Sequence, residues 1–288
     1  MKGPKGPFSF FANIYELGGA LVPFDEQNYR QLRQNMQNTG VAREVLIGHT
    51  VFYKETTETT MIDSLEGVVA GVSSGSVFVA GQQLAGRGRK GRSFVSAPDS
   101  GLWATTYYEL ESMKQANQVT MVAALAVRDA VELASGLQAD IKWPNDILVG
   151  SKKLAGILPD LQVTGDHVTV HLGTGINIRT PETLPTEVRD IATSIHGEGY
   201  SPPSIEELLA CLTYSLEVRH VQSSSAPDQL WEEWSENLVT IGRRIRLSTP
   251  NGDVTGIAEA VTNSGELILR TDEGSRESYS AGEVHTIG

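Results

Sequence analysis

The stretch KWPNDILVGSKKLAGIL, residues 142–158, holds the pattern that decides the fold. Pro144 follows the short apolar segment 141–143, and a proline there ends strand pairing and forces a turn. Asn145 and Asp146 then stand at the end of a strand, where ligands usually bind in open α/β sheets. Taken alone, the Asn-Asp pair also fits ordinary turn chemistry, so both interpretations stay open at this point.

The second half of that stretch pairs cations with small residues. Lys152 and Lys153 precede Ala155 and Gly156, and side chains this small let other groups approach the backbone closely. A lysine in such a place is often only solvated. Beside a strand end with polar residues, however, it is also suited to hold an anion.

A basic loop lies upstream, in GQQLAGRGRKGR, residues 81–92. Its cations are Arg87, Arg89, Lys90 and Arg92, and no acidic residue falls between positions 81 and 98 to neutralise them. Glycine-rich backbone is costly to order, which favours a loop that an anionic ligand orders. Arginine forks grip carboxylates and phosphates. A solvated basic loop is the alternative.

Two common nucleotide motifs do not explain this loop. Gly86, Gly88 and Gly91 spell G-x-G-x-x-G, but a dinucleotide fingerprint needs a helix directly after it, and SFVSAPDSG (93–101) is a poor helix. A Walker loop would need Gly-Lys-Ser/Thr, which is missing here. The loop therefore suits a phosphorylated or adenylylated small molecule.

The chain reads as three zones. Residues 1–22 predict a flexible lead-in, 23–237 a catalytic domain of mixed strands and helices, and 238–288 short strands with Asn-Gly-type turns that predict a small antiparallel barrel. Hydrophobic patterns predict strands at 77–80, 141–143 and 168–172, a turn at 173–175, helices at 24–37, 118–134 and 205–221, a connector at 222–228 and a short helix with Trp231 and Trp234. Ser204 and Glu207 form the capping box that opens the helix at 205.

Composition and charge narrow the class of protein. The chain has 288 residues, 40% of them hydrophobic, with a net charge of −12, which disfavours a surface that binds nucleic acid broadly. Its single cysteine, Cys211, excludes an intrachain disulfide and fits a reducing cytosol. No apolar run reaches the roughly 18–20 residues that cross a bilayer, and the N-terminus is a poor signal peptide. We expect a cytoplasmic protein.

A third stretch, GTGINI (173–178), completes a specific set. In this order, the basic loop, the KWPND–KLAGIL segment and G-x-G-I-N resemble the biotin protein ligases over roughly residues 23–288. The resemblance implies an α+β fold: a mixed-sheet, class II synthetase-like catalytic domain plus a C-terminal SH3-like β-barrel. It implies an enzyme that makes biotinyl-5′-AMP from biotin and ATP and then passes biotin to one lysine of a biotin carboxyl carrier domain of a carboxylase.

The resemblance also assigns site residues by position. It implies catalysis by Lys153, Arg87, Arg89 and Asp146, biotin binding by Thr59, Thr60, Gln83, Gly86, Arg87, Gly88, Arg89, Lys153, Gly156, Gly173 and Gly175, and nucleotide binding by Arg89, Lys90, Arg92, Asn145 and Asn177. ATP is expected to bring Mg²⁺ with it, because the sequence offers no metal cage of its own. A homodimer is a possible assembly.

Three positions depart from the family pattern. Met61 stands where many members have an asparagine, Phe94 where a tryptophan is common, and Pro159 leaves the continuation of the KLAGIL strand open. Only 58 residues precede Thr59, so we expect a ligase without an operator-binding domain.

Two rival functions remain. A lipoate or octanoate ligase or transferase would share the fold, although a transferase would want a cysteine in the pocket and Cys211 falls on a distal helix. A non-enzymatic nucleic-acid-binding module would use the basic loop and the barrel. Against it, the segment from residue 238 onward carries five Arg but seven Asp and Glu.

Overall fold

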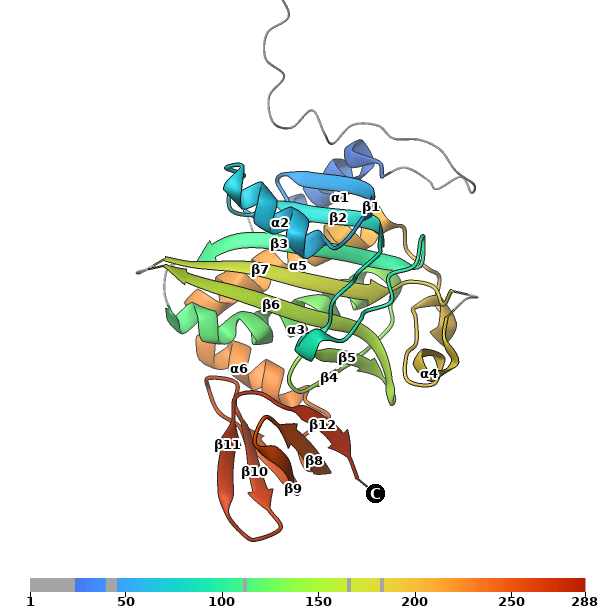
Figure 1. The fold of residues 1–288 in the computed structure, drawn as a ribbon. Coiled ribbons are helices and arrows are strands. Elements are labelled where there is room, and N and C mark those ends of the chain that lie inside the picture. Colours follow the sequence, from blue (N-terminus) through green and yellow to red (C-terminus); the bar gives the residue numbers. More distant parts are fainter. Residues whose placement is uncertain (1–23, 40–45, 111–112, 165–166, 182–183, 288) are drawn as a thin grey trace, which may run out of the picture.

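The computed structural model describes residues 24–39, 46–110, 113–164, 167–181 and 184–287 (Figure 1). The predicted lead-in, 1–22, lies outside them. A mixed seven-stranded sheet forms the larger part, in the order β1-β2-β3-β7-β6-β5-β4, and only β1 and β2 pair in parallel. Its strands are β1 (Val51–Thr57), β2 (Val77–Gln83), β3 (Gly101–Leu110), β4 (Asp140–Lys142), β5 (Asp146–Val149), β6 (Lys152–Thr164) and β7 (His167–Asn177).

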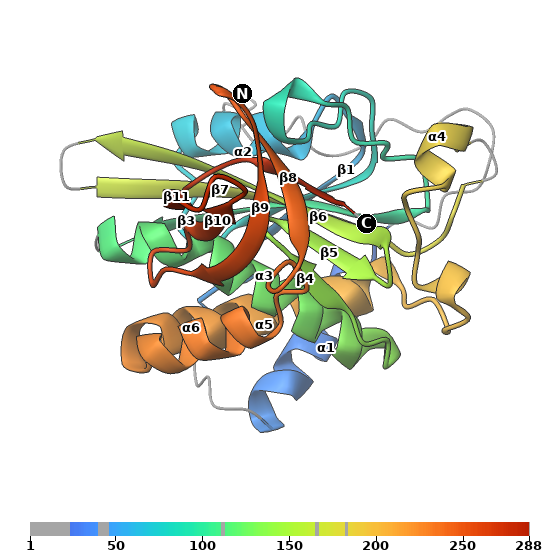
Figure 2. The ribbon, with the colours of Figure 1, turned by 90° about the horizontal axis from the view of Figure 1, so that it is seen from below.

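Helices cover both faces of this sheet. Figure 2 shows α2 on one face and α1, α3, α5 and α6 on the other. The helices are α1 (Glu26–Thr39), α2 (Thr60–Val69), α3 (Met113–Ser135), α4 (Thr186–Arg189), α5 (Ile205–Ser225) and α6 (Pro227–Glu236), with 3₁₀ turns at Arg89–Gly91 and His196–Glu198. The buried alanines of α3 let it pack closely against α5, which confirms the helix expected at 118–134.

The predicted capping box is present at the start of α5. The Ser204 hydroxyl accepts a hydrogen bond from the Glu207 N–H at 3.1 Å, and the Glu207 carboxylate accepts one from the Ser204 N–H at 2.8 Å. The predicted connector at 222–228 is wrong, because α5 runs to Ser225 and α6 begins at Pro227. Within this last turn of α5, the hydroxyls of Ser223 and Ser225 donate to the carbonyls of His220 and Val221.

The predicted turn at 173–175 is also wrong. These residues lie inside β7, which pairs with β3 on one side and β6 on the other. The glycines serve close approach instead of turning the chain. A Cβ on Gly175 would lie 2.8 Å from the Phe94 ring, and one on Gly173 would lie 3.1 Å from the Met61 methyl.

Pro159 does not interrupt β6, which continues to Thr164. The Ile157 N–H donates to the Asn145 carbonyl, on the side of β6 away from β7. The N–H that Pro159 lacks would point to that same side, since alternate residues of a strand point alike. β5 pairs with β6 only as far as Gly156, so the proline costs no ladder hydrogen bond there.

The C-terminal part is a separate antiparallel sheet, which confirms the expected α+β architecture. Its order is β11-β10-β9-β8-β12, built from β8 (Arg244–Thr249), β9 (Gly252–Val261), β10 (Leu267–Thr271), β11 (Arg276–Tyr279) and β12 (Glu283–Thr286). Glycines with positive φ occupy the predicted turns: Gly252 (121°), Gly265 (87°) and Gly274 (90°). This sheet lies below α6 and β4 in Figure 1.

Two tryptophans attach the C-terminal sheet to the rest of the molecule. The Trp143 indole N–H donates to the Gly265 carbonyl at 2.9 Å, and that of Trp231 donates to the Thr262 carbonyl at 3.0 Å. Leu238 also forms a parallel bridge with Ile141 of β4. The proposed domains 23–237 and 238–288 therefore meet at Leu238, which pairs with β4 at the edge of the larger sheet.

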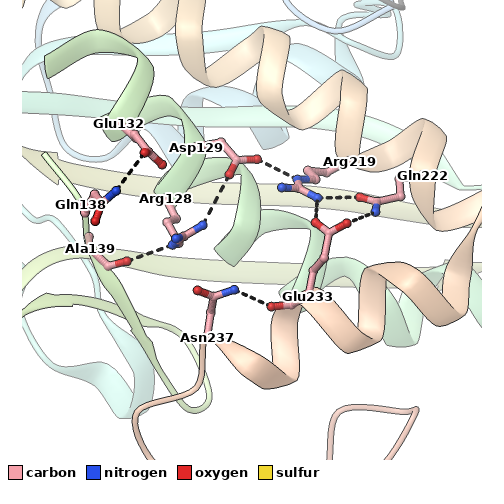
Figure 3. A network of polar contacts seen from close by, with 9 residues as sticks. All are labelled: Arg128, Asp129, Glu132, Gln138, Ala139, Arg219, Gln222, Glu233 and Asn237. Atoms are coloured by element: carbon pink, nitrogen blue, oxygen red, sulfur yellow. Dashed lines mark hydrogen bonds and ion pairs between the residues drawn. The ribbon is translucent and has the colours of Figure 1, made fainter. Parts of the chain in front are cut away.

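A polar network fixes the helix that leads into this attachment (Figure 3). Arg219 of α5 donates to Asp129 of α3 at 2.7 Å and forms an ion pair with Glu233 of α6. Asn237, just after α6, donates to the Glu233 carbonyl and accepts the Ile141 N–H. These contacts connect α3, α5, α6 and β4 next to the point where the C-terminal sheet is attached.

Candidate active site

Two cavities adjoin the basic loop, one of 590 Å³ and one of 80 Å³. Five residues line both of them: Gly88, Arg89, Phe94, Asn145 and Lys153. The two spaces therefore meet at a cationic junction, formed by the basic loop on one side and by the β4–β6 region on the other.

A β-bulge aims Lys153 into this junction. Between β5 and β6 the register shifts at Ile147 and Leu148, so one extra residue of β6 faces them. The extra residue changes the alternation of side chains between the two faces of the sheet, so the Lys153 side chain runs over Gly156. A Cβ on Gly156 would lie 3.0 Å from both Cε and Nζ of Lys153. Lys153 Nζ lies 2.6 Å from Asp146 Oδ1 and 5.7 Å from the centre of the Phe94 ring.

The smaller cavity has one polar end and an apolar middle. Thr60 donates to the Gln83 amide oxygen through its N–H (2.9 Å) and hydroxyl (3.1 Å), and its Oγ1 lies 2.8 Å from that of Thr105. The Gln83 amide donates in turn to Ser96. The remaining lining is largely apolar and includes Met61, Phe94, Ala104, Ile157 and Leu158. Arg87, whose side chain is exposed, and Lys153 supply positive charge.

Most of the expected biotin-binding residues come together here. Thr59, Thr60, Gln83, Arg87, Gly88, Arg89, Lys153, Gly156, Gly173 and Gly175 all line the smaller cavity. Gly86 does not: its carbonyl accepts the Phe94 N–H at 2.8 Å and closes the base of the basic loop. A Cβ on Gly86 would lie 2.5 Å from the Phe94 carbonyl oxygen, so this position needs glycine for packing.

The larger cavity gathers the expected nucleotide-binding residues: Arg89, Lys90, Arg92, Asn145 and Asn177, together with Asp146. Asn145 is held from both sides, because its amide donates to the Ile157 carbonyl at 2.6 Å and its oxygen accepts from Arg89 at 3.1 Å. Asn177 donates to the carbonyls of Thr193 (2.8 Å) and Lys153 (3.4 Å). Its NH₂ group therefore positions the wall of the cavity.

Several lining residues escaped the sequence analysis. Lys142 and Trp143 belong to the recognised KWPND segment but were given no role, and Trp103 lies on β3, a strand that no pattern predicted. The others come from segments that carried no functional signal: Arg179, Thr180, Pro181, Leu184, Val188, Ile191, Ala192 and Thr193 after β7, and Gly282, Glu283, Val284 and His285 of the C-terminal sheet.

The basic loop touches the C-terminal sheet directly. Arg92 forms an ion pair with Glu283, Lys90 donates to the Ser248 carbonyl at 3.2 Å, and Arg89 reaches the Gly282 carbonyl at 3.5 Å. Burial lowers the pKa of the Arg89 guanidinium, although the nearby carboxylates of Asp146 and Glu283 raise it. An arginine remains charged under such a shift, so the junction keeps its positive charge.

The described ranges contain no group of three or more His, Cys, Asp or Glu side chains that could hold a metal ion. In the same part of the chain, no helix is both long and apolar enough to cross a bilayer. Cys211 is buried on α5 and lines neither cavity, and burial raises the pKa of its thiol to about 12.

Comparison with known proteins shows which family the chain resembles. Residues 53–177 match the model of the Biotin/lipoate A/B protein ligase family, and residues 240–285 match that of the Biotin protein ligase C terminal domain. The chain is 34% identical over 249 residues to the bifunctional ligase/repressor BirA of Bacillus subtilis, covering 84% of this chain and 75% of that protein.

Two further likenesses agree. The chain is 34% identical over 236 residues to the biotin–acetyl-CoA-carboxylase ligase of Mycobacterium tuberculosis, covering 79% of this chain and 85% of that one. The solved structure of the Aquifex aeolicus biotin protein ligase in complex with biotin and ATP matches with a TM-score of 0.70 at 24% identity, over 83% of this chain and 99% of that one, and shows the same fold. The chain therefore belongs to the biotin protein ligase family.

Proposed function

We propose that this protein activates biotin with ATP to biotinyl-5′-AMP and transfers the biotin to a lysine of a biotin carboxyl carrier domain. The observation that carries the proposal is that Lys153 and Arg89 line both cavities. Two ligands bound side by side would thus share one cationic junction. The relatives named as biotin ligases, and the related fold that holds biotin and ATP together, support this assignment.

The smaller cavity suits biotin. Its hydrogen-bonding end, at Thr60 and Gln83, fits a cyclic urea, which has both N–H donors and a carbonyl acceptor. Its apolar middle fits a thioether ring and an alkyl chain. Its cationic end, at Arg87 and Lys153, fits the carboxylate at the end of that chain. Met61 takes the place of an amide at the polar end, so Thr59 and Thr60 are the proposed partners of the ring.

The larger cavity suits ATP. Arg89, Lys90, Arg92, Lys142 and Arg179 surround it with positive charge for the phosphates. Leu184, Val188 and Ile191 give it an apolar wall on which a base can lie. Asn145 and Asn177 are proposed to fix the nucleotide side of the pocket. We propose that Mg²⁺ enters bound to ATP, as part of the substrate complex.

The first half-reaction joins two anions. The biotin carboxylate attacks the α-phosphorus, a carbon–oxygen–phosphorus anhydride forms, and pyrophosphate leaves. Two unit charges about 4 Å apart repel by about 4 kcal/mol at an effective dielectric constant of about 20. Arg87, Arg89 and Lys153 offset that repulsion and stabilise the charge that builds on the phosphoryl oxygens.

The second half-reaction needs a neutral amine. The acceptor lysine attacks the acyl carbon, an amide forms, and AMP leaves with the bonding electrons. With an unperturbed pKa of about 10.4, keeping that lysine neutral near pH 7.4 costs about 4 kcal/mol. Asp146 is the proposed residue to orient or deprotonate the amine, since its carboxylate lies at the junction beside Lys153.

The test is pyrophosphate release from Mg²⁺-ATP, measured separately with biotin, lipoate and octanoate. Release with biotin, followed by a mass increase of one biotinyl group on a carrier domain, is the expected result. Release with lipoate or octanoate but not biotin would assign the protein to the lipoate branch of the superfamily.

The rival functions fit less well. An acyl transferase with a cysteine nucleophile would need a reactive thiol at the cavity, and Cys211 is buried away from it. In the C-terminal sheet, arginines 244, 246, 270 and 276 each form an ion pair with a carboxylate, of Asp272, Asp253 or Glu259. Such paired charges do not favour a nucleic-acid surface. Operator DNA is therefore not among the partners we propose, and the cytoplasm is the proposed compartment.

A further inference from the structure

The glycine-rich part of the basic loop, residues 86–92, is hydrogen-bonded within itself at its base and contacts the C-terminal sheet at its tip. At its base, the Phe94 N–H donates to the Gly86 carbonyl and the Gly88 N–H donates to the Arg92 carbonyl at 2.7 Å. At its tip, Lys90 and Gly91 take positive φ angles of 57° and 73°. The tip side chains are exposed and reach across to the C-terminal sheet.

The C-terminal sheet is the fixed partner in this contact. The indole of Trp143, which is 1% exposed, and the bridge between Leu238 and Ile141 attach it to the larger sheet. A glycine-rich loop at the surface has much less to hold it. If the contact opens, it is therefore the loop that moves.

Glu283 makes the one carboxylate contact to this loop within the described residues. Its Oε2 pairs with Arg92, while its Oε1 lies 3.6 Å from His285 Nε2. The hydrogen bond from Arg92 lowers the pKa of Glu283, so the carboxylate stays charged near neutral pH. It also lines the larger cavity, beside the proposed phosphate site.

A carboxylate on the wall of a cavity that binds phosphates repels them. The position of Glu283 therefore indicates that this side chain has a structural role. We propose that Glu283 is a positioning residue: it holds Arg92 and thereby keeps the basic loop, with Arg89, in place against the larger cavity before a ligand binds. This inference rests on the proposed function only for the role of the ligand. The contact between loop and sheet can be tested without it.

The direction in which the KM for ATP changes in Glu283→Gln distinguishes the two ways in which Glu283 could act. If its charge only repelled phosphates, Glu283→Gln would lower the KM for ATP. If Glu283 positions the loop, the same change raises that KM by about two- to fivefold, the size expected for loss of one partly exposed ion pair. The turnover number at saturating ATP should change less, because bound phosphates then hold the loop themselves.

The first experiment measures loop opening without any activity. Trypsin cuts after Arg87, Arg89, Lys90 and Arg92, and Glu283→Gln leaves all four sites intact. We expect cleavage within residues 86–92 to become about two- to fivefold faster in Glu283→Gln, by mass spectrometry of the fragments. Glu259→Gln is the matched control, since Glu259 pairs with Arg270 and Arg276 in the same sheet away from both cavities.

The second experiment is a charge exchange. Glu283→Arg should open the loop further, and adding Arg92→Glu should slow trypsin cleavage after Arg87, Arg89 and Lys90 toward the wild-type rate, because the ion pair then forms with its charges exchanged. A KM that falls in Glu283→Gln, a loop cleaved no faster than in wild type and Glu259→Gln, or a double variant no better than Glu283→Arg would each overturn the proposal. Absence of pyrophosphate release in the wild type would overturn the proposed function instead, while the trypsin result would still decide the role of Glu283.

Discussion

Lys153 and Asp146 face each other across the β5–β6 hairpin, with 2.6 Å between Nζ and Oδ1. Both side chains are about one-third exposed, at 34% and 27%, so solvent and ligands can reach the pair. The bulge in β6 creates this pairing, because without the extra residue Lys153 and Gly156 would point to opposite faces of the sheet. The proposed catalytic lysine thus owes its direction to an irregularity of the strand.

Lys153→Ala should nearly abolish adenylate formation and leave the fold intact. Loss of one preorganised charge beside a developing anion costs about 3–4 kcal/mol, or at least a hundredfold in rate. The Asp146 carboxylate left behind is partly solvated, so the melting temperature should change little. Pyrophosphate release with biotin measures the rate. Lys152→Ala is the matched control, because the neighbouring Lys152 is exposed and lines neither cavity. A Lys153→Ala rate within threefold of wild type would remove Lys153 from the mechanism.

Sequence patterns were reliable where local chemistry decides the structure. The capping box at Ser204, the apolar stripe of α3 and the glycine turns of the C-terminal sheet act over a few residues, and all three were predicted correctly. The prediction of a turn at 173–175 was wrong because those glycines make room for Phe94 and Met61, side chains that the tertiary fold brings against them. Nothing in the local sequence distinguishes the two uses of glycine.

The same limit applies to the site. Most residues of the smaller cavity were named through the family resemblance, which the motifs near residues 87, 153 and 175 carry and which also assigned Thr59 and Thr60. The contribution of the C-terminal sheet could not be found this way. Arg92 and Glu283 are 191 positions apart in the sequence, and the short strand around Glu283 resembles any other polar strand. The C-terminal sheet lines the larger cavity, so it should support adenylate synthesis as well as transfer.

His171 should make the fold less stable in mild acid. It is buried on β7, lies 2.8 Å from the Ser64 hydroxyl of α2 through Nδ1, and stacks on Tyr107. Burial lowers the pKa of this imidazole, although Asp160 raises it in part. The unfolded chain takes up the proton near pH 6.5 whereas the folded chain does not, so stability falls as the pH drops below about 6.5 and levels off below the folded pKa.

Urea denaturation of wild type and His171→Gln at pH 7.5 and 5.5 measures this effect. The loss of stability between the two pH values should be smaller in His171→Gln. His167→Gln, an exposed histidine on the same strand, should keep the wild-type loss. An equal loss in all three proteins would mean that His171 does not set the pH dependence.

Trp143→Phe should destabilise the protein more than Trp234→Phe. Both indoles are 1% exposed, so each change removes a similar buried volume. The Trp143 N–H, however, donates to the Gly265 carbonyl, whereas the Trp234 N–H has no partner among the described atoms. Losing a buried hydrogen bond and leaving its acceptor unpaired costs about 1–3 kcal/mol, which is the expected difference between the two variants in urea unfolding. Equal destabilisation would show that this hydrogen bond does not hold the C-terminal sheet.

Arg89→Gly should release biotinyl-5′-AMP into solution before the biotin is transferred. Arg89 joins the loop to Asn145 and to the C-terminal sheet, and it lines both cavities. Its loss removes these contacts and adds backbone freedom, at a combined cost of about 2–4 kcal/mol. The closed population then falls at least tenfold, and the reactive anhydride reaches water and stray amines. We expect a streptavidin blot to show biotin on added serum albumin with Arg89→Gly, less with Arg89→Lys, and none with wild type. Clean albumin with Arg89→Gly, in a reaction that still labels the carrier domain, would mean that the basic loop does not retain the adenylate.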